Sequence, residues 1–124
     1  MSTRQNFLTI LKPLLPSGWR LDPSRSPRDA FSKPTVRVSR MQTLKDTPEA
    51  PQGARTARFL VTLIEPDTDV DQGGERIENA VEQLLTAIEG CPNQISHKGA
   101  TAVQWGDKYP NAYDIPVDVI TSKE

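Results

Sequence analysis

The chain has 124 residues, which suits one domain with a single core. Its one cysteine, Cys91, excludes an internal disulfide framework, and the lack of a signal peptide or of an apolar run of membrane length indicates a protein made in the cytosol. The 11 prolines and the low apolar content of 35% indicate a modest core with many loops.

The net charge of −1 conceals an uneven distribution along the chain. Residues 1–62 hold 11 Lys or Arg against 4 Asp or Glu, a balance of +7, whereas residues 63–124 hold 4 against 12, a balance of −8. Three arrangements fit this asymmetry. The halves interleave in one sheet so that their fields cancel, or the surface attracts a copy of itself head to tail, or the basic half contacts nucleic acid.

The N-terminal segment predicts an amphipathic helix. Ser2 and Gln5 have the spacing of a capping box, in which two residues cap each other's backbone N–H. Apolar residues then recur at helical spacing from Phe7 to Leu15. Pro13 strains the last turn, and the Pro-Ser-Gly sequence of residues 16–18 ends the helix.

The middle of the chain predicts strands separated by two long loops. A short strand fits residues 19–21, and residues 22–34, with three prolines and three serines, predict a loop. Residues 35–44 open with the alternation of a half-buried strand, and the polar residues 45–56 predict the second loop. Residues 59–64 are apolar on both faces, as in a central strand, so one face needs a helix and the other a helix or another subunit.

The second half predicts one helix and two strands. The helix covers residues 71–89, with a left-handed cap expected at Gly90, and the strands cover residues 100–105 and 113–120. The buried stripe of this helix is expected to consist of Ile77, Ala80, Val81, Leu84, Leu85 and Ile88. Pro116 lies in the last strand, and because proline lacks an N–H, we expect that strand to be an edge of the sheet.

These elements predict an α+β (mixed α/β) fold. We expect a small, mostly antiparallel sheet of 4–5 strands packed with two helices, in the order α-β-β-α-β-β. The domain is single and covers residues 1–124, with long loops at 22–34 and 45–56. Long loops in compact domains are commonly functional or disordered, so the two loops are the first places to look for partner contacts.

The aspartates of residues 67–71, followed by Glu78, have part of the spacing of an EF-hand calcium loop. Gln72 occupies the position of the turn-forming glycine, however, and a strand precedes the loop where a helix belongs. We therefore expect these carboxylates to cap the N-terminus of the second helix.

Other candidate sites are weak. Cys91 and His97 have no companion ligands nearby in sequence, and the three aspartates before Gly73 and Gly74 would repel a phosphate. We expect no catalytic residue, no metal and no cofactor.

The order of elements and several segments resemble the small tail terminator, or tail-completion, proteins of long-tailed bacteriophages. The resemblance covers nearly the whole chain. It rests on the N-terminal amphipathic helix and on five segments: residues 34–38 (PTVRV), 57–66 (ARFLVTLIEP), 84–88 (LLTAI), 100–103 (ATAV) and 109–117 (YPNAYDIPV).

The resemblance implies a structural virion protein that forms a ring, usually of six copies, on the head-proximal end of the tail tube. Such a ring ends tube polymerisation and forms the joint to the head. The implied partners are other copies, the tail tube protein and a head-closure or connector protein, with no membrane and no specific nucleic acid. The location would be the tail or neck of the virion, after assembly in the host cytoplasm.

Other functions remain open at this stage: another phage neck component, such as a head-closure or connector protein, a nucleic-acid-binding accessory domain, or a small enzyme. For the terminator reading, we expect contacts with the tube, the neck or an adjacent subunit at Arg25, Arg28, Phe31, Lys45, Glu49, Arg55 and Arg58.

Overall fold

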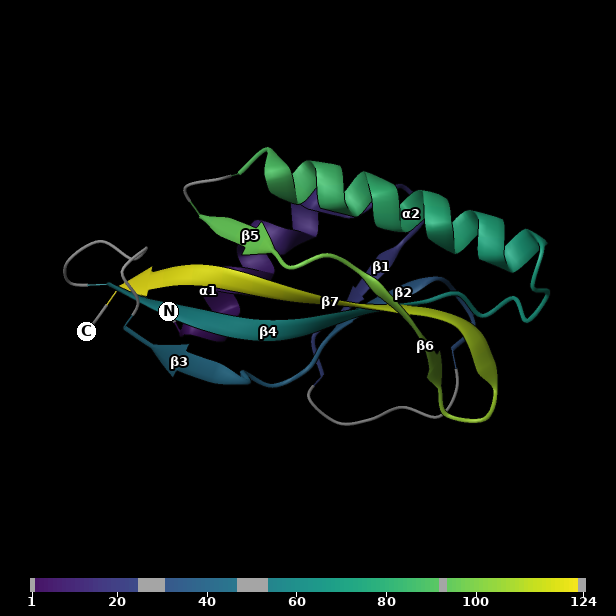
Figure 1. Cartoon of the computed structure of the whole chain (residues 1–124), viewed down its shortest axis with the longest axis horizontal. Coiled ribbons are helices and arrows are strands. Elements are labelled where there is room, and N and C mark those ends of the chain that lie inside the picture. Colours follow the sequence, from purple (N-terminus) through teal and green to yellow (C-terminus); the bar gives the residue numbers. More distant parts are fainter. Residues whose placement is uncertain (1, 25–30, 47–53, 92–93, 123–124) are drawn as a thin grey trace.

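The structure, a computed structural model, describes residues 2–24, 31–46, 54–91 and 94–122. These residues form seven strands in one mixed sheet, two α-helices and one 3-10 helix (Figure 1). In chain order the elements are α1 (Thr3–Leu11), η1 (Lys12–Leu14), β1 (Arg20–Asp22), β2 (Thr35–Val38), β3 (Thr43–Lys45), β4 (Ala54–Ile64), α2 (Gln72–Glu89), β5 (Ile95–His97), β6 (Thr101–Trp105) and β7 (Tyr109–Ser122). None of the described helices is long and apolar enough to cross a membrane.

The predicted fold class is wrong, because the sheet dominates the structure and has seven strands in place of 4–5. Three of the strands, β1, β3 and β5, are three residues long, which is too short for a visible alternation of apolar and polar residues. Residues 35–44 were predicted as one strand but form β2 and the start of β3. Both of these strands pair with the same edge of β4, and the chain bends between them.

Two long antiparallel strands form the centre of the sheet. β4 pairs with β7 from Ala54 opposite Ser122 to Ile64 opposite Ala112. β2 and β3 pair with the edge of β4 that faces away from β7, whereas β5 and β6 pair with the edge of β7 that faces away from β4. β1 pairs with β2 in parallel, which makes the sheet mixed. Every short strand is thus positioned by one of the two long ones or by its neighbour.

The last strand is not an edge, which corrects the prediction made from Pro116. β7 has β4 on one side and β5 and β6 on the other. The carbonyl of Pro116 points to the second side, where it accepts a hydrogen bond from the backbone N–H of Lys98 (2.9 Å). β5 ends at His97 and β6 begins at Thr101, so the proline nitrogen lies at the gap between them, where no donor is needed.

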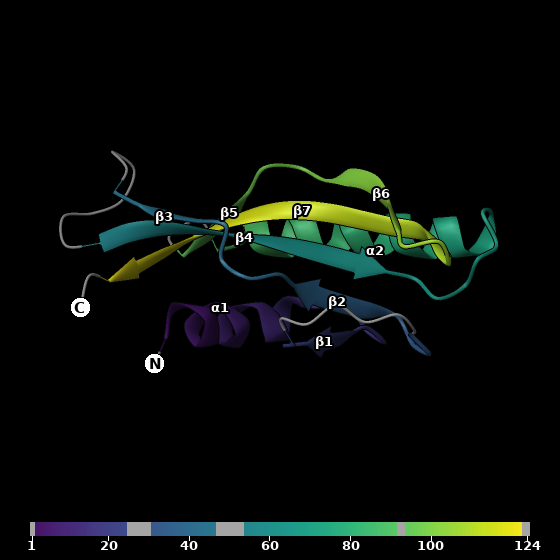
Figure 2. The same ribbon diagram turned by 90° about the horizontal axis from the view of Figure 1, so that it is seen from below.

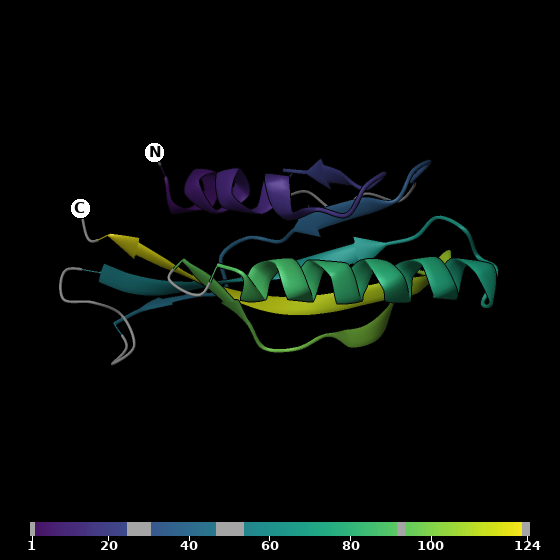
Figure 3. The same cartoon turned by 90° about the horizontal axis from the view of Figure 1, so that it is seen from above.

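α1 and α2 pack on the same face of the sheet, α2 along β7 and α1 beside β2 and β4 (Figures 2 and 3). The ring of Phe7 stacks on that of Phe59, with centroids 4.9 Å apart, and both rings are fully buried. Of the predicted stripe on α2, every member is buried except Leu85, which is half-buried. The core therefore lies between the helices and one face of β2, β4 and β7.

The capping box at the start of α1 is confirmed. The N–H of Ser2 donates to Oε1 of Gln5 (3.1 Å), and the N–H of Gln5 donates to Oγ of Ser2 (3.1 Å). The α-helix ends at Leu11, earlier than predicted, and continues as the 3-10 turn η1. Pro13 explains this change, because it has no N–H for the next α-helical hydrogen bond.

Arg4 joins α1 to the ends of two strands. Its guanidinium donates to the carbonyls of Val38 and Ser39 (2.7 Å each) and of Pro23 (2.9 Å). The side chain is buried, so these charged hydrogen bonds replace water. Sequence patterns do not show this role, since an arginine in the first turn of a helix ordinarily faces solvent.

The opposite face of the sheet, which we call the open face, is covered by neither helix. At one end of it Phe31, Ile64, Tyr109 and Ala112 form a small second core. Beyond that cluster, the side chains of β4 and β7 on this face are polar or half-buried, among them Arg58, Thr62, Asp114, Pro116 and Asp118. Residues 59–64 thus meet helices on only one face of the sheet. Outside the small second core, their open-face side chains are the surface to examine for partner contacts.

Candidate functional site

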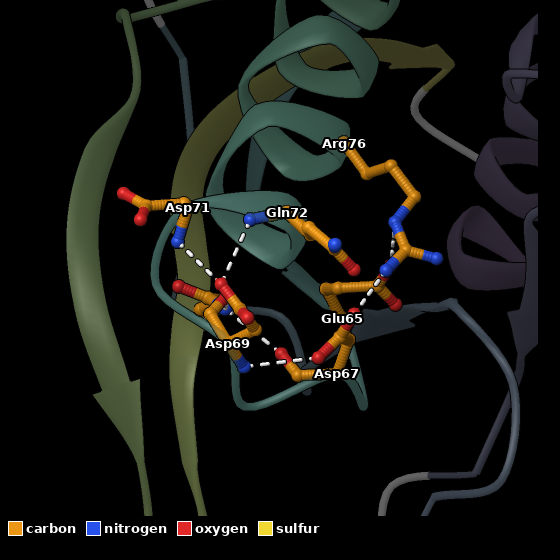
Figure 4. Close-up of polar contacts among 7 residues, drawn as sticks. Glu65, Asp67, Asp69, Asp71, Gln72 and Arg76 are labelled. Atoms are coloured by element: carbon orange, nitrogen blue, oxygen red, sulfur yellow. Dashed lines mark hydrogen bonds and ion pairs between the residues drawn. The ribbon is translucent and has the colours of Figure 1, made fainter.

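The turn before α2 gathers several carboxylates around backbone N–H groups (Figure 4). Oδ1 of Asp69 accepts from the N–H of Asp71 (2.8 Å) and of Gln72 (3.0 Å). Oδ1 of Asp67 accepts from the N–H of Asp69 (2.9 Å). The predicted capping role is confirmed for Asp69, which accepts from the N–H of Gln72 at the start of α2. Asp71, the N-cap residue, makes no side-chain capping hydrogen bond, and Asp67 accepts from an N–H within the turn itself.

Glu65 lies beneath this turn with only 2% of its surface exposed. Its Oε1 atom is 3.1 Å from Nε of Arg76, whose guanidinium also contacts Asp67 (Figure 4). Burial raises the pKa of Glu65, and the positive charge of Arg76 opposes that rise. The pair joins the residue that follows β4 to the second turn of α2.

Asn111 and Gly73 hold the same turn against β7. The side-chain amide of Asn111 donates to the carbonyls of Asp67 (2.8 Å) and Asp69 (3.0 Å), while the backbone carbonyl of Asn111 accepts from the N–H of Glu65 (3.0 Å). A Cβ at Gly73 would lie 2.5 Å from both the Asn111 amide nitrogen and the Asp67 carbonyl oxygen. The glycine is therefore needed for close packing, which gives it a structural role without phosphate.

His97 pairs with a glutamate across the end of α2. Its Nε2 lies 2.7 Å from Oε2 of Glu89, and its Nδ1 accepts from the N–H of Gly99 (3.0 Å). Cys91 is a half-buried free thiol. Within the part of the chain that the structure describes, no three His, Cys, Asp or Glu side chains are grouped to hold a metal ion.

The open face carries a groove, which we call the basic groove. It has a volume of about 370 Å³ and lies across β3, β4, β7 and β5. Its charged lining consists of Lys45, Arg58, Lys98 and Asp118, with Thr43 and Ser96 between them. Three cations and one carboxylate give the lining an excess of positive charge.

An ion-pair cluster crosses the centre of the basic groove. Arg58 binds Asp118 through two hydrogen bonds, from Nε (2.7 Å) and from an Nη (3.1 Å), and Nζ of Lys98 lies 3.7 Å from the same carboxylate. The hydrogen bond to Asp118 raises the pKa of Arg58, which stays charged. The Arg58 side chain is still 38% exposed. Lys45 meets no carboxylate among the described residues, so the described lining of the groove keeps its excess of positive charge.

The structure brings two of the predicted contact residues, Lys45 and Arg58, together in this groove. Arg55 lies nearby on β4 and pairs with Asp46 (3.6 Å), and both of these side chains are exposed. Arg25, Arg28 and Glu49 lie outside the described residues.

Phe31 takes a different place from the other predicted contacts. Its ring is 7% exposed and meets Tyr109 and Trp105 edge to face, at centroid distances of 5.4 Å and 6.2 Å. Its backbone N–H donates to the Tyr109 hydroxyl (2.7 Å). Phe31 therefore anchors the end of its loop on the open face.

Sequence reasoning missed two members of the basic groove. Neither Asp118 nor Lys98 was predicted from the sequence as part of a site. Their meeting with Arg58 depends on the β4–β7 register, which places Arg58 opposite Asp118. The one available signal was the alternation of charged and apolar residues in both strands, which puts the charges on one face.

Comparison of the chain with models of known protein families and with curated proteins found no match.

Proposed function

We propose that this protein is a structural virion component of a long-tailed bacteriophage. Copies of it form a ring on the head-proximal end of the tail tube, end tube polymerisation and provide the joint to the head. The resemblance of five sequence segments to tail terminator proteins motivates the proposal. The structural observation that carries it is the open face: both described helices lie on one side of the sheet, and the other side keeps a charged groove.

A molecule with two unlike faces favours head-to-tail contact between copies. Such heterologous contacts generate rings when the rotation between subunits closes. The half-buried residues of the open face, with Leu60 and Pro116 among them, could then gain burial from a neighbour. A ring formed in this way would act by shape: one side matches the tube end, and the other gives no site for a further tube subunit.

The polar groups of the structure favour this contact role over chemistry. The carboxylates of the turn before α2 bind backbone N–H groups and Arg76, and Asp118 binds Arg58. These groups stabilise the fold or one another. We propose no enzymatic activity and no cofactor.

The test adds the purified protein to polymerising tail-tube subunits from the same genome. Tubes should become shorter as the protein is added, and electron microscopy should show extra density at one tube end only. Unchanged tube lengths, with the protein free in solution, would overturn the capping function. The same protein added to finished tubes is the control, since it should bind one end without changing their length.

The alternative functions give different results in the same set of assays. A head-closure or connector protein would bind a terminated tail or a portal and leave polymerisation unchanged. A nucleic-acid-binding domain would retain DNA in a strongly salt-sensitive way. Either result without tube shortening would replace the proposed function.

A further inference from the structure

One side of α2 carries a row of carboxylates, which we call the acidic stripe. It consists of Asp71, Glu75, Glu78, Glu82 and Glu89. At about 100° per residue all five lie within one narrow sector of the helix, away from the buried stripe of Ile77, Val81 and Leu84. All five are exposed, and Glu75, Glu78 and Glu82 meet no Lys or Arg among the described residues. This surface therefore carries unneutralised negative charge.

The acidic stripe and the basic groove lie on opposite sides of the sheet. α2 lies in front of β7 when the molecule is viewed from above, and behind the sheet when it is viewed from below (Figures 2 and 3). The groove is on the open face. The two charged surfaces of one molecule therefore cannot meet each other, but those of two copies can.

We propose that the basic groove of one copy receives the acidic stripe of the next copy. The inference rests on the self-assembly in the proposed function and names the surfaces that would carry it. The charges are complementary in sign, since the groove has an excess of cations and the stripe has only carboxylates. Because the two surfaces differ, the contact is heterologous and repeats from copy to copy, as a ring requires.

The lengths of the two surfaces also agree. Lys45 and Lys98 lie on opposite sides of the Arg58–Asp118 pair. Along the strand direction, Lys45 is aligned with Ile120 of β7 and Lys98 with Pro116 of β7. Three strand spacings and this offset along β7 separate their backbones by roughly 20 Å. Along the stripe, Glu75 and Glu89, whose Oε2 also contacts His97, are about 21 Å apart at 1.5 Å per residue. A helix laid diagonally over the groove can thus offer carboxylates to both lysines at once.

Charge reversal on each surface tests the contact. The groove variant is Lys45→Glu with Lys98→Glu, and the stripe variant is Glu75→Lys with Glu82→Lys. Arg58 is left unchanged, because its two hydrogen bonds to Asp118 join β4 to β7 within one copy. Lys98 contacts the same carboxylate only at 3.7 Å and is 53% exposed, so its reversal disturbs the fold less. The matched control is Lys12→Glu with Lys108→Glu, two exposed lysines outside the groove.

Association is measured by sedimentation over a range of concentrations at low salt, with circular dichroism to verify folding. We expect each variant to self-associate more than about tenfold more weakly than the wild type, since like charges would then face each other. The chain carrying both pairs of reversals should recover association, and so should an equal mixture of the two variants. The control should behave as the wild type.

Three outcomes would overturn the inference. They are a wild type that stays monomeric at every concentration, association that neither variant weakens, and a combined chain that fails to recover although it is folded. DNA retention that the groove variant abolishes, in a protein that stays monomeric, would also overturn it by placing nucleic acid in the groove.

Tube lengths separate this inference from the proposed function. Assembly through the groove together with unchanged tubes would overturn capping and leave the interface standing. Tubes shortened equally by the wild type and both variants would overturn the interface and leave capping standing.

Discussion

Two neighbouring glycines of α2 are expected to respond in opposite directions to the same substitution. Gly73→Ala should destabilise the fold, because the added methyl would lie 2.5 Å from both the Asn111 side-chain nitrogen and the Asp67 carbonyl oxygen. Gly74→Ala should stabilise it, because its methyl would meet nothing closer than 3.9 Å. The pair is well matched, since both glycines are buried in the first turn of one helix.

The size of the effect follows from what the methyl would displace. The Asp67 oxygen belongs to the backbone, and the Asn111 amide is fixed by its hydrogen bonds to the carbonyls of Asp67 and Asp69. Neither can move away as a flexible side-chain end could, so Gly73→Ala should cost about 1–3 kcal/mol, as overpacking does. Gly74→Ala should add about 0.4–1 kcal/mol by restricting the unfolded chain.

Urea unfolding followed by circular dichroism measures both changes in one buffer. The two midpoints should lie on either side of the wild-type midpoint with an unchanged slope. Adding Asn111→Ala to Gly73→Ala should not restore stability, because the contact with the Asp67 oxygen remains. A Gly73→Ala protein as stable as the Gly74→Ala protein would refute the tight packing of α2 against β7 and the turn before it.

Two further substitutions test buried charges in the same assay. Because burial raises the pKa of Glu65 above its ordinary value of 4.5, its protonated form stabilises the fold in acid, and this contribution is lost as the pH rises through the raised pKa. The free energy of unfolding of Glu65→Gln, relative to that of the wild type, should therefore rise as the pH rises from 4.5 through the raised pKa of Glu65. A relative free energy of unfolding that falls with rising pH would contradict the raised pKa. Arg4→Met should cost about 2–4 kcal/mol, since three carbonyls lose a charged donor. A cost below about 1 kcal/mol would mean that water replaces the guanidinium.

The helices were predictable because their signals are local. Ser2 and Gln5 are three residues apart, and the buried stripe of α2 repeats every three or four residues. These contacts form within one or two turns and do not depend on the rest of the fold. The helix ends differed. Pro13 accounts for the early end of α1, and Gly90 caps α2 with a φ of −75° in place of the expected left-handed conformation.

The sheet was less predictable because its short strands depend on distant partners. β3 and β5 have three residues each and extend only because β4 and β7 offer them hydrogen bonds. The edge predicted from Pro116 was wrong, because the sequence could not show that two short strands, β5 and β6, flank the proline on the second side of β7. The basic groove was out of reach for the same reason, because Lys98, Arg58 and Asp118 meet only through strand register.

The long ladder at the centre of the sheet also has a consequence for how the protein is made. Phe59 pairs with Val117, 58 positions later in the chain, so β4 leaves the ribosome well before the strand that completes its pairing. Until β7 is synthesised, the nascent chain exposes a bare edge of β4, and the core under α1 and α2 lacks the residues that β7 contributes. Soluble yield should therefore depend on the translation rate and on chaperones that hold nascent chains, and slow expression at low temperature should favour it.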